Sequence, residues 1–314
     1  MRNTTGLLCG ILAALRRNRL ATVGSVLLVG LVLLAISAPL LTRIHWLKEP
    51  IHQDQNGLDS DGMPLPVSGT HVLGTDNLGR DVLARTIHGA RVSLSVGTAA
   101  VLAATLVGVT VGLLAGFYGG KMDLGLMRLT EIALAIPSIL LAVALAGLMD
   151  KSRIIHLHPA ALPWHSLDIE FKRGVASLFI VIGFVSWPGM VRVIRGQVLS
   201  LKERDYITAA RALGATDLAI IFRHLIPNLL PTVIILSVMN TGNTILIEAG
   251  LGYLGIGVPP PAPTWGSMVA DGQPYFIAAP HIVIVPGVAI LLTVLSFNLL
   301  GQGLQEVMDP KRER

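Results

Sequence analysis

The sequence predicts an all-α polytopic membrane protein with six transmembrane helices and with both termini in the cytoplasm. Two features of composition carry this prediction. The 314-residue chain is 52% hydrophobic and only 14% charged, whereas soluble proteins carry about 25% charged residues. Its mean hydropathy is +0.67. A third feature is that the uncharged residues gather in runs long enough to cross a bilayer core of about 30 Å as helices.

Each predicted span is an uncharged run bounded by charged residues. About 20 apolar residues suffice for a spanning helix, and the six runs cover residues 20–42, 92–120, 132–149, 174–191, 224–247 and 272–305. A seventh run contains "GVPPPAPTWG". Proline lacks the backbone donor and clashes with the preceding turn, so this run is expected to be a loop, re-entrant or otherwise. Six spans place both termini on one side.

The distribution of basic residues predicts the orientation. With the N-terminus inside, the inner segments hold 15 of the 24 Lys and Arg residues, as the positive-inside rule requires. This rule also explains the net charge of +5, which we do not interpret as nucleic-acid binding. The predicted order is a cytoplasmic amphipathic segment, a first span, an outer loop, a five-helix core with a cytoplasmic loop, and a cytoplasmic tail. Their ranges are 1–19, 20–42, 43–91, 92–305 (loop 192–227) and 306–314.

The first hydrophobic run has 23 residues, which exceeds a signal-peptide core of about 7–15 residues, so we expect an uncleaved span. The single cysteine, Cys9, excludes an intrachain disulfide and a metal site with several cysteines. In the first outer loop, Asp76 or Asp81 is expected to cap a short helix running toward Arg91. The second outer loop, 150–173, carries three histidines: His156, His158 and His165. Their spacing does not suit metal binding from one face of a helix, and we predict no metal site there.

Charged residues inside the spans would mark coupling ions or catalysis. The only acidic residues close to the membrane interior are Glu131 and Glu248, and both lie toward the ends of their predicted spans. The sequence contains no GxxxxGK[ST] motif for binding nucleotide phosphates and no GxSxG motif for a nucleophile. We therefore expect no catalysis and no cofactor in this chain, and if it moves a solute against a gradient, the energy is expected to come from another chain.

Prolines and small residues shape the predicted spans. Pro137 and Pro188 interrupt the third and fourth spans, Pro227 and Pro231 mark the start of the fifth, and Pro286 lies in the sixth. The second span carries small residues at helical spacing, which suits close helix packing. They are Gly97, Gly108, Gly112 and Gly116. These prolines and small residues could serve helix packing alone, or they could allow the helices of a transport pathway to tilt; both interpretations remain open.

The stretch "YITAARALGATDLAIIFRHLIP", residues 206–227, is polar although apolar runs flank it. Asp205 is expected to cap a first helix that Gly214 ends, and Asp217 to cap a second helix before Pro227 starts the next span. Ile207, Ala210 and Gly214 would share one face. That narrow, small-residue face suits docking into a partner's groove, whereas an ordinary re-entry loop would explain only the polarity.

This segment resembles the EAA loop of ABC-importer permeases. Ala209, Ala210, Gly214 and Pro227 match the family pattern at the required spacing, while Thr208 replaces the family's glutamate and His224 its isoleucine. The stretches "LGTDNLGRDVLARTIHGARVSL", "GFYGGKMDLGLMRLTEIALAIPSILLA", "PPPAPTWGSMVADG" and "FNLLGQGLQEVMDPK" are similar to the second permease of dipeptide/oligopeptide/nickel importers. The similarity covers residues 16–311, with a longer 150–173 loop.

The resemblance implies a subunit of a complex in the bacterial inner membrane that imports peptides. Its expected partners are a second homologous permease, one or two ABC ATPase subunits that carry ATP and Mg, an extracytoplasmic substrate-binding protein, and membrane lipid. Nickel, glutathione or another small solute remains an alternative cargo. A membrane scaffold or channel without an ATPase remains an alternative class.

Two groups of site residues follow. The resemblance implies coupling to the ATPase through Tyr206, Ile207, Ala209, Ala210, Arg211, Gly214, Ala215 and Asp217. Substitutions Gly214→Pro or Ala210→Arg are expected to abolish uptake and ATPase association while the protein still inserts. Small polar side chains in the spans are the candidates for the substrate pathway, because no charge is available there. They are Ser138, Ser186, Asn240, Thr241 and Asn243.

Overall fold

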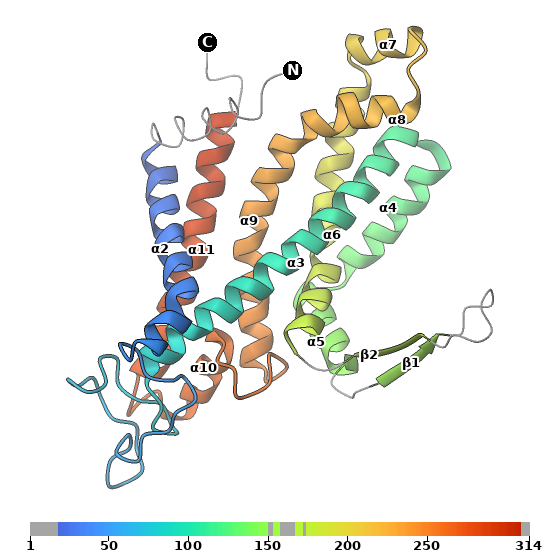
Figure 1. Cartoon of the computed structure of the whole chain (residues 1–314). Helices are drawn as coiled ribbons and strands as arrows, with labels where there is room; N and C mark the ends of the chain where they lie inside the picture. Colours follow the sequence, from blue (N-terminus) through green and yellow to red (C-terminus); the bar gives the residue numbers. More distant parts are fainter. Residues whose placement is uncertain (1–17, 150–152, 158–166, 172–173, 309–314) are drawn as a thin grey trace.

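The computed structural model describes residues 18–149, 153–157, 167–171 and 174–308. Helices make up nearly all of the regular structure (Figure 1). In chain order the elements are α2 (Arg19–Arg43), α3 (Val82–Tyr118), α4 (Gly120–Ala135), α5 (Ser138–Met149), β1 (Arg153–Leu157), β2 (Leu167–Phe171), α6 (Val175–Lys202), α7 (Asp205–Ala212), α8 (Asp217–Ile220), the π-helical turn η1 (Ile221–Leu225), α9 (Ile226–Tyr253), α10 (Trp265–Gly272), the 3₁₀ turn η2 (Gln273–Tyr275) and α11 (His281–Met308).

Five helical units of the described chain are long and apolar enough to cross a membrane, and a bent pair makes a sixth. The bent pair is α4 and α5, whose axes differ by 89°. Ile136 adopts an extended conformation before Pro137, as sterics favour for the residue that precedes a proline. The predicted interruption at Pro137 is therefore confirmed, but the bounds of the third span, 132–149, are wrong at the start, because α4 begins at Gly120.

Several other helix ends differ from the predicted spans. Asp81 caps α3 by accepting a 2.8 Å hydrogen bond from the Ala84 amide, as expected for one of the two candidate caps. The helix does not stop near Arg91, however, but continues into the span. The fourth span likewise runs on to Lys202. The predicted spans end at the first charged residue. The helices are longer because they continue beyond the bilayer into water, where charged side chains are well solvated.

The second outer loop departs from the all-α prediction, because β1 and β2 form an antiparallel hairpin. The register pairs Ile155 with Ile169, and β-branched residues at such positions favour strands. Of the three loop histidines, His156 lies in β1, whereas His158 and His165 fall outside the described residues. No cluster of three metal-ligating side chains occurs in the described part of the chain. The amphipathic segment 1–17 and the tail 309–314 also lie outside it.

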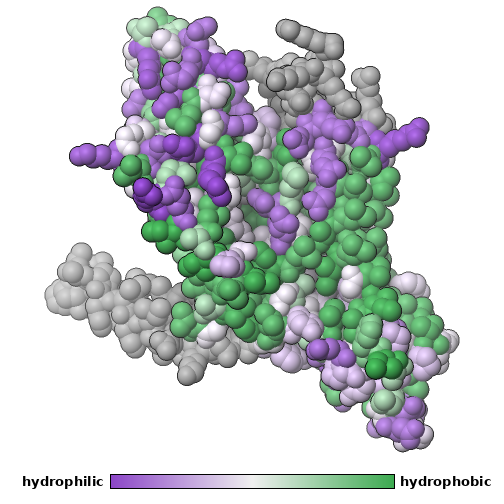
Figure 2. All heavy atoms as spheres, turned by 180° about the vertical axis from the view of Figure 1, so that it is seen from behind, coloured by the Kyte–Doolittle hydropathy of each residue, from purple (hydrophilic) through white to green (hydrophobic). Residues whose placement is uncertain are grey.

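Helix α3 is the central support, since α2, α6 and α9 all pack against it (Figure 1). Its glycines bring α6 close: a Cβ on Gly108 would lie 2.6 Å from Met190 Cβ, and one on Gly112 would lie 2.8 Å from the Val191 oxygen. The prediction of tight packing at these glycines is confirmed. Apolar side chains cover the middle of the surface and polar ones gather toward its ends (Figure 2), as a bilayer requires.

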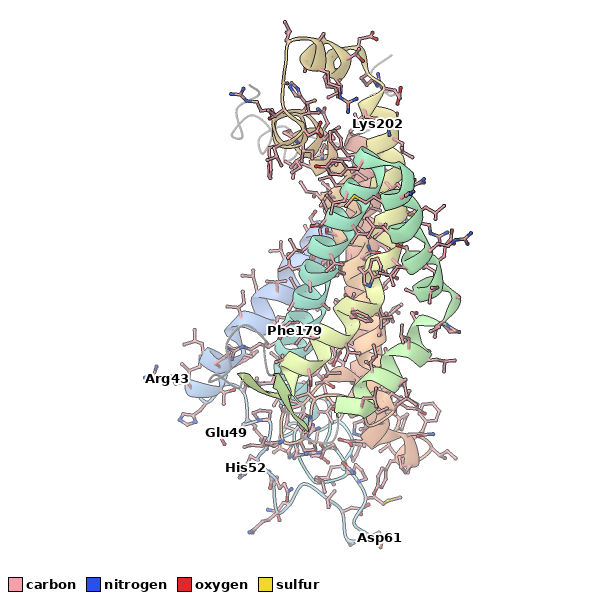
Figure 3. The ribbon with its side chains drawn as sticks, turned by 90° about the vertical axis from the view of Figure 1, so that its right-hand side faces the viewer. Arg43, Glu49, His52, Asp61, Phe179 and Lys202 are labelled. Atoms are coloured by element: carbon pink, nitrogen blue, oxygen red, sulfur yellow. The ribbon has the colours of Figure 1, made fainter. Side chains whose placement is uncertain are left out.

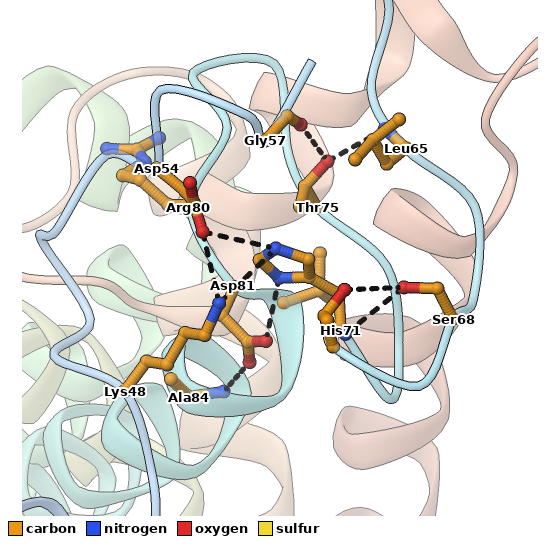
Figure 4. Close-up of polar contacts among 12 residues, drawn as sticks. Lys48, Asp54, Gly57, Leu65, Ser68, His71, Thr75, Arg80, Asp81 and Ala84 are labelled. Atoms are coloured by element: carbon orange, nitrogen blue, oxygen red, sulfur yellow. Dashed lines mark hydrogen bonds and ion pairs between the residues drawn. The ribbon is translucent and has the colours of Figure 1, made fainter. Parts of the chain in front are cut away.

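The 44–81 loop is irregular, but buried polar contacts hold it (Figure 4). His71 is 2% exposed; its Nδ1 lies 3.1 Å from Asp81 Oδ2, and its Nε2 lies 3.3 Å from Lys48 Nζ. The hydroxyl of Thr75 donates to the Gly57 carbonyl over 2.6 Å. A hydrogen bond from the Asn56 amide and the Lys48 ammonium lower the pKa of the Asp54 carboxyl. This loop lies at the end of the molecule opposite Lys202 (Figure 3).

Ion pairs join this loop to α3 and α10. Arg85 Nε of α3 lies 3.2 Å from Asp76 Oδ2 of the loop, and Arg80 Nη2 of the loop lies 3.6 Å from Asp271 Oδ2 of α10. Burial raises the pKa of the Asp271 carboxyl, although two guanidinium groups lie beside it. Glu248 is fully buried close to α10, and neither of its oxygens has a hydrogen-bond partner in the described chain. It lies near the outer end of α9, as predicted, although the helix continues for five more residues to Tyr253.

Candidate functional site

The candidate site is an arm formed by α7, α8 and η1, which projects from the end of the bundle where α2 begins and α11 ends (Figure 1). The predicted helix–Gly–helix order is correct, but both predicted caps are wrong by one residue. Arg204 is the N-cap residue of α7, and Thr216 caps α8 through a 3.3 Å hydrogen bond from the Ala219 amide. Asp205 and Asp217 lie in the first turns of α7 and α8. Their negative charges interact favourably with the partial positive charge at each helix N-terminus.

Gly214 ends α7 in a left-handed conformation, with φ of +83°. Its amide donates to the Arg211 carbonyl over 2.9 Å, and the Ala215 amide donates to the Ala210 carbonyl over 3.0 Å. These bonds close the helix end and turn the chain toward α8. The geometry of the arm therefore depends on a residue without a Cβ at this position.

The arm is attached to the bundle by a buried apolar cluster. Ile207 is completely buried, together with residues of the arm, α3, α6 and α9. The other buried members are Leu113, Phe117, Met190, Ile194, Val198, Ile220, Ile221, Leu225 and Leu229. The predicted docking face is therefore wrong at Ile207, because this side chain faces the chain's own core. A fully buried Ile contributes about 1.5–3 kcal/mol, which here fixes α7 to the spans.

Two ring contacts reinforce this attachment. The rings of Tyr206 and His224 lie 6.0 Å apart, joining α7 to η1. The Arg211 guanidinium lies 5.6 Å from the centre of the Phe117 ring, joining α7 to the end of α3. Cation–π contacts at such distances contribute about 0.5–1 kcal/mol where they are exposed. Tyr206 and Arg211 thus hold the arm in place as well as lying near its surface.

The opposite surface of the arm is open and contains large apolar side chains. Leu213 is 88% exposed, Phe222 66% and Leu218 63%. Thr208 and Ala209 are exposed too, while Ala210 and Ala215 are partly buried. Leu213, Leu218 and Phe222 were not among the predicted site residues. A signal was available for Leu213, because helical periodicity does not place it on the same side of α7 as Ile207.

The arm continues directly into the fifth span, because α8, η1 and α9 form one helical unit, Asp217–Tyr253. Pro227 therefore lies within this unit and does not start a separate span. It has no amide hydrogen to donate, and the preceding turn widens into η1, in which the Ile226 amide donates to the Ile221 carbonyl. The Asn228 side chain donates to the His224 carbonyl over 2.6 Å. Movement of the arm is thus linked to α9 without an intervening loop.

A bidentate ion pair braces the same end of the bundle. Arg195 of α6 donates to both carboxylate oxygens of Asp123 of α4, over 2.5 and 2.6 Å. Such paired charge-assisted bonds fix geometry more firmly than single ones. Lys202 donates to the Gly116 carbonyl of α3 over 3.0 Å. The three helices beneath the arm are therefore tied together.

The predicted pathway residues fall in different environments. Ser138 is exposed at the start of α5, just after the bend. Thr241 is 6% exposed, and its hydroxyl donates to the Ser237 carbonyl over 2.8 Å, so it lies inside the protein. Asn240 is partly buried and Asn243 is exposed on α9, and Ser186 of α6 has a buried hydroxyl without a partner in the described chain.

Comparison with known proteins decides the family. Residues 108–314 match the family model described as binding-protein-dependent transport system inner membrane component. The chain belongs to this family. Residues 10–61 match a second model, the N-terminal TM domain of oligopeptide transport permease C. The sequence-based assignment is confirmed, and the protein is a multi-pass component of a bacterial inner membrane transport system.

Named relatives of this inner membrane component extend over most of its length. It is 37% identical to the dipeptide transport system permease protein DppC of Alkalihalophilus pseudofirmus, covering 95% of this chain and 88% of the relative. It is 38% identical to the glutathione transport system permease protein GsiD of Pectobacterium atrosepticum, covering 82% and 78%. It is 35% identical to the oligopeptide transport system permease protein OppC of Bacillus subtilis, covering 94% and 87%.

The fold of this inner membrane component also resembles a solved transporter. A chain from a structure of the MetNI methionine ABC transporter in an inward-facing conformation aligns with a TM-score of 0.54. The alignment covers 72% of this chain and 98% of that chain, at 18% identity. At this identity the similarity supports the fold alone. It accords with the five- or six-helix membrane core described above.

Proposed function

We propose that this protein is a permease subunit of an ATP-driven ABC importer that carries dipeptides and oligopeptides into the cytoplasm. The observation that supports this function most strongly is the arm: a rigidly attached, non-membrane element whose open surface carries Leu213, Leu218 and Phe222. Exposed apolar residues of this size on a polar element mark a protein contact. The partner is an ATPase subunit, whose closure on ATP moves the arm and, through the continuous helix, α9.

The same arm supports the proposed orientation. Its end of the molecule is the cytoplasmic end, and α2 begins and α11 ends there: the Asn18 side chain donates to Glu306 over 2.7 Å. The 44–81 loop then faces the extracytoplasmic side, where an extracytoplasmic substrate-binding protein delivers cargo. A second homologous permease completes the pathway in the membrane. ATP and Mg are bound by one or two ATPase subunits, and no cofactor is assigned to this chain.

Glutathione is the second candidate cargo, because a relative named for glutathione transport is as similar as those named for peptides. Glutathione is itself a small peptide, so one pathway chemistry serves both cargoes. Nickel or another small solute has no comparable observation in the described residues. An ATPase-independent scaffold or channel remains the alternative class that the experiment must separate.

The test is uptake by the reconstituted complex of this chain, its partner permease, ATPases and binding protein. We expect labelled dipeptide to accumulate in proteoliposomes only with ATP and the binding protein, and excess unlabelled dipeptide to compete more strongly than glutathione. The matched control contains the same proteins with an ATPase that binds ATP but does not hydrolyse it. ATP-independent equilibration would instead establish a channel, and stronger competition by glutathione would reassign the cargo.

A further inference from the structure

We propose that the facing surfaces of α6 and α9 form a binding site for the peptide groups of the cargo at the middle of the membrane. Ser186, Asn240 and Asn243 are its residues. The inference deepens the proposed function and rests on it, because it assigns a contact to the cargo of the pathway. Of the five residues predicted for the substrate pathway, the proposed site includes these three and excludes Ser138 and Thr241.

The two helices run in opposite directions and share apolar clusters toward both of their ends. At the outer end Leu178 and Ile182 of α6 share an apolar cluster with Leu251 of α9. At the inner end Ile194 and Val198 of α6 pack in the cluster that contains Leu229 of α9. Both helices also pack on α3. The facing surfaces between these two apolar contacts are therefore bounded at each end.

One hydrogen bond fixes which sides face each other. Gln197 Nε2 of α6 donates to Thr232 Oγ1 of α9 over 2.7 Å. Ser186 lies eleven residues before Gln197, and Asn243 lies eleven residues after Thr232. Eleven residues return to nearly the same side of a helix after three turns, about 16 Å along its axis. Because the helices are antiparallel, going from Gln197 back to Ser186 and from Thr232 on to Asn243 moves the same distance toward the outer end of the bundle. Ser186 and Asn243 therefore lie at the same depth in the membrane, on the sides of α6 and α9 that face each other.

Asn240 completes the group, since residues three apart on a helix are neighbours on its surface. It is also at the midpoint of the 28-residue helix α9. A helix of this length is about 42 Å long, so Asn240 lies near the centre of a hydrocarbon core of about 30 Å. The three side chains are thus placed at the depth where transported solutes are farthest from water on either side.

Polar groups on these facing surfaces are available to a solute. The Ser186 hydroxyl and the Gln197 side-chain oxygen of α6 are buried and unpaired in the described chain. On α9, Asn240 is partly buried and Asn243 is exposed, so their carboxamides are open to a solute. Leaving an amide unpaired in an apolar environment costs roughly 2–7 kcal/mol. Other polar residues of the spans avoid this cost: Asn298 of α11 donates to the Val294 carbonyl over 3.0 Å. The unpaired groups on α6 therefore require an external partner.

The chemistry of the group matches peptide bonds. Each asparagine offers a carbonyl acceptor and two amide donors, and the serine offers one donor and acceptor sites. These groups pair with the N–H and C=O groups of a peptide whatever its side chains are. None of the three is charged, so the site discriminates little between acidic and basic peptides. This suits a pathway that receives its cargo already selected.

The test uses the reconstituted complex and the substitutions Asn240→Leu and Asn243→Leu, with Asn298→Leu as the matched control. Each lost hydrogen bond should lower peptide uptake per ATP hydrolysed by about fivefold, since such bonds contribute about 1 kcal/mol. The ATPase rate stimulated by loaded binding protein should stay unchanged, because the arm is intact. The Asn298→Leu complex should retain uptake, because its carboxamide only bonds its own helix.

Unchanged uptake per ATP in an assembled Asn240→Leu/Asn243→Leu complex would overturn the site while leaving the proposed function standing. Failure of the unsubstituted complex to import any peptide would overturn the function itself. Where the leucine variants do not assemble, Asn243→Asp keeps the size and polarity of the side chain. At a pH at which the carboxyl group is ionised, its charge should change the uptake ratio of basic to acidic peptides by about fivefold or more. A ratio that equals the wild-type value at every pH tested would refute the contact.

Discussion

Gly214→Pro is expected to abolish ATP-driven uptake while the protein still inserts into the membrane. Proline requires φ near −65°, whereas Gly214 has φ of +83°. The substitution also removes the amide that donates to the Arg211 carbonyl over 2.9 Å. The end of α7 must then unwind, and Leu213, the most exposed apolar residue of the arm, leaves its position. Uptake and co-purification of the ATPase are the two measurements.

A graded series at the same position separates this conformational effect from a general defect. Asparagine tolerates the left-handed region better than alanine does, and proline cannot enter it. Uptake should therefore fall in the order Gly214, Gly214→Asn, Gly214→Ala, Gly214→Pro, with equal amounts of protein in the membrane. Wild-type uptake in an inserted Gly214→Pro variant would show that the turn does not transmit movement from the ATPase.

Gly266→Ala is expected to destabilise the junction between α9 and α10. A Cβ at Gly266 would lie 2.7 Å from the Cα of Ala249 and even closer to its carbonyl oxygen, so the two backbones must separate. Overpacking of this kind costs about 1–3 kcal/mol. Because Asp271 of α10 also pairs with Arg80 of the 44–81 loop, this loop should loosen with α10. The thermal unfolding midpoint of the purified complex should fall.

The matched control for this prediction is Gly30→Ala in α2. A Cβ at Gly30 meets nothing within 4 Å, and alanine favours a helix over glycine by up to about 1 kcal/mol. This variant should be as stable as the wild type or slightly more so. Equal unfolding midpoints for Gly266→Ala and the wild type would contradict the close backbone contact that joins α10 to α9.

Much of this fold follows from charge spacing along the chain. Charged residues end the uncharged runs, so the runs locate the spans, and the polar 206–227 stretch indicates an element outside the membrane. The bend at Pro137 and the turn at Gly214 were also predictable. Proline interrupts a helix because it lacks the amide donor, and glycine ends one because it readily adopts a left-handed conformation. The family pattern, with Ala209, Ala210 and Gly214 in place, added the coupling role that remains a proposal.

The orientation of side chains could not be read in the same way. Ile207 was expected on the docking face because periodicity shows which residues share a side, but it does not show which side meets the protein's own core. The pairing of Gln197 with Thr232 was likewise hidden, since two spans far apart in sequence have no register until they are folded. The β1–β2 hairpin was missed because the two prolines between its strands were used only as evidence against helical spacing of the histidines.

The most direct test of the central claim, that the arm receives movement from an ATPase, is cross-linking from Leu213. The chain has one cysteine, so a Cys9→Ser background with Leu213→Cys carries a single thiol on the most exposed apolar residue of the arm. The control is Val26→Cys on the lipid-facing side of α2, which is 66% exposed. We predict a cross-link to the ATPase from Leu213→Cys alone, with a yield that changes when ATP is bound. An assembled, transporting complex in which Leu213→Cys reacts with a soluble thiol reagent but never with the ATPase would contradict the claim.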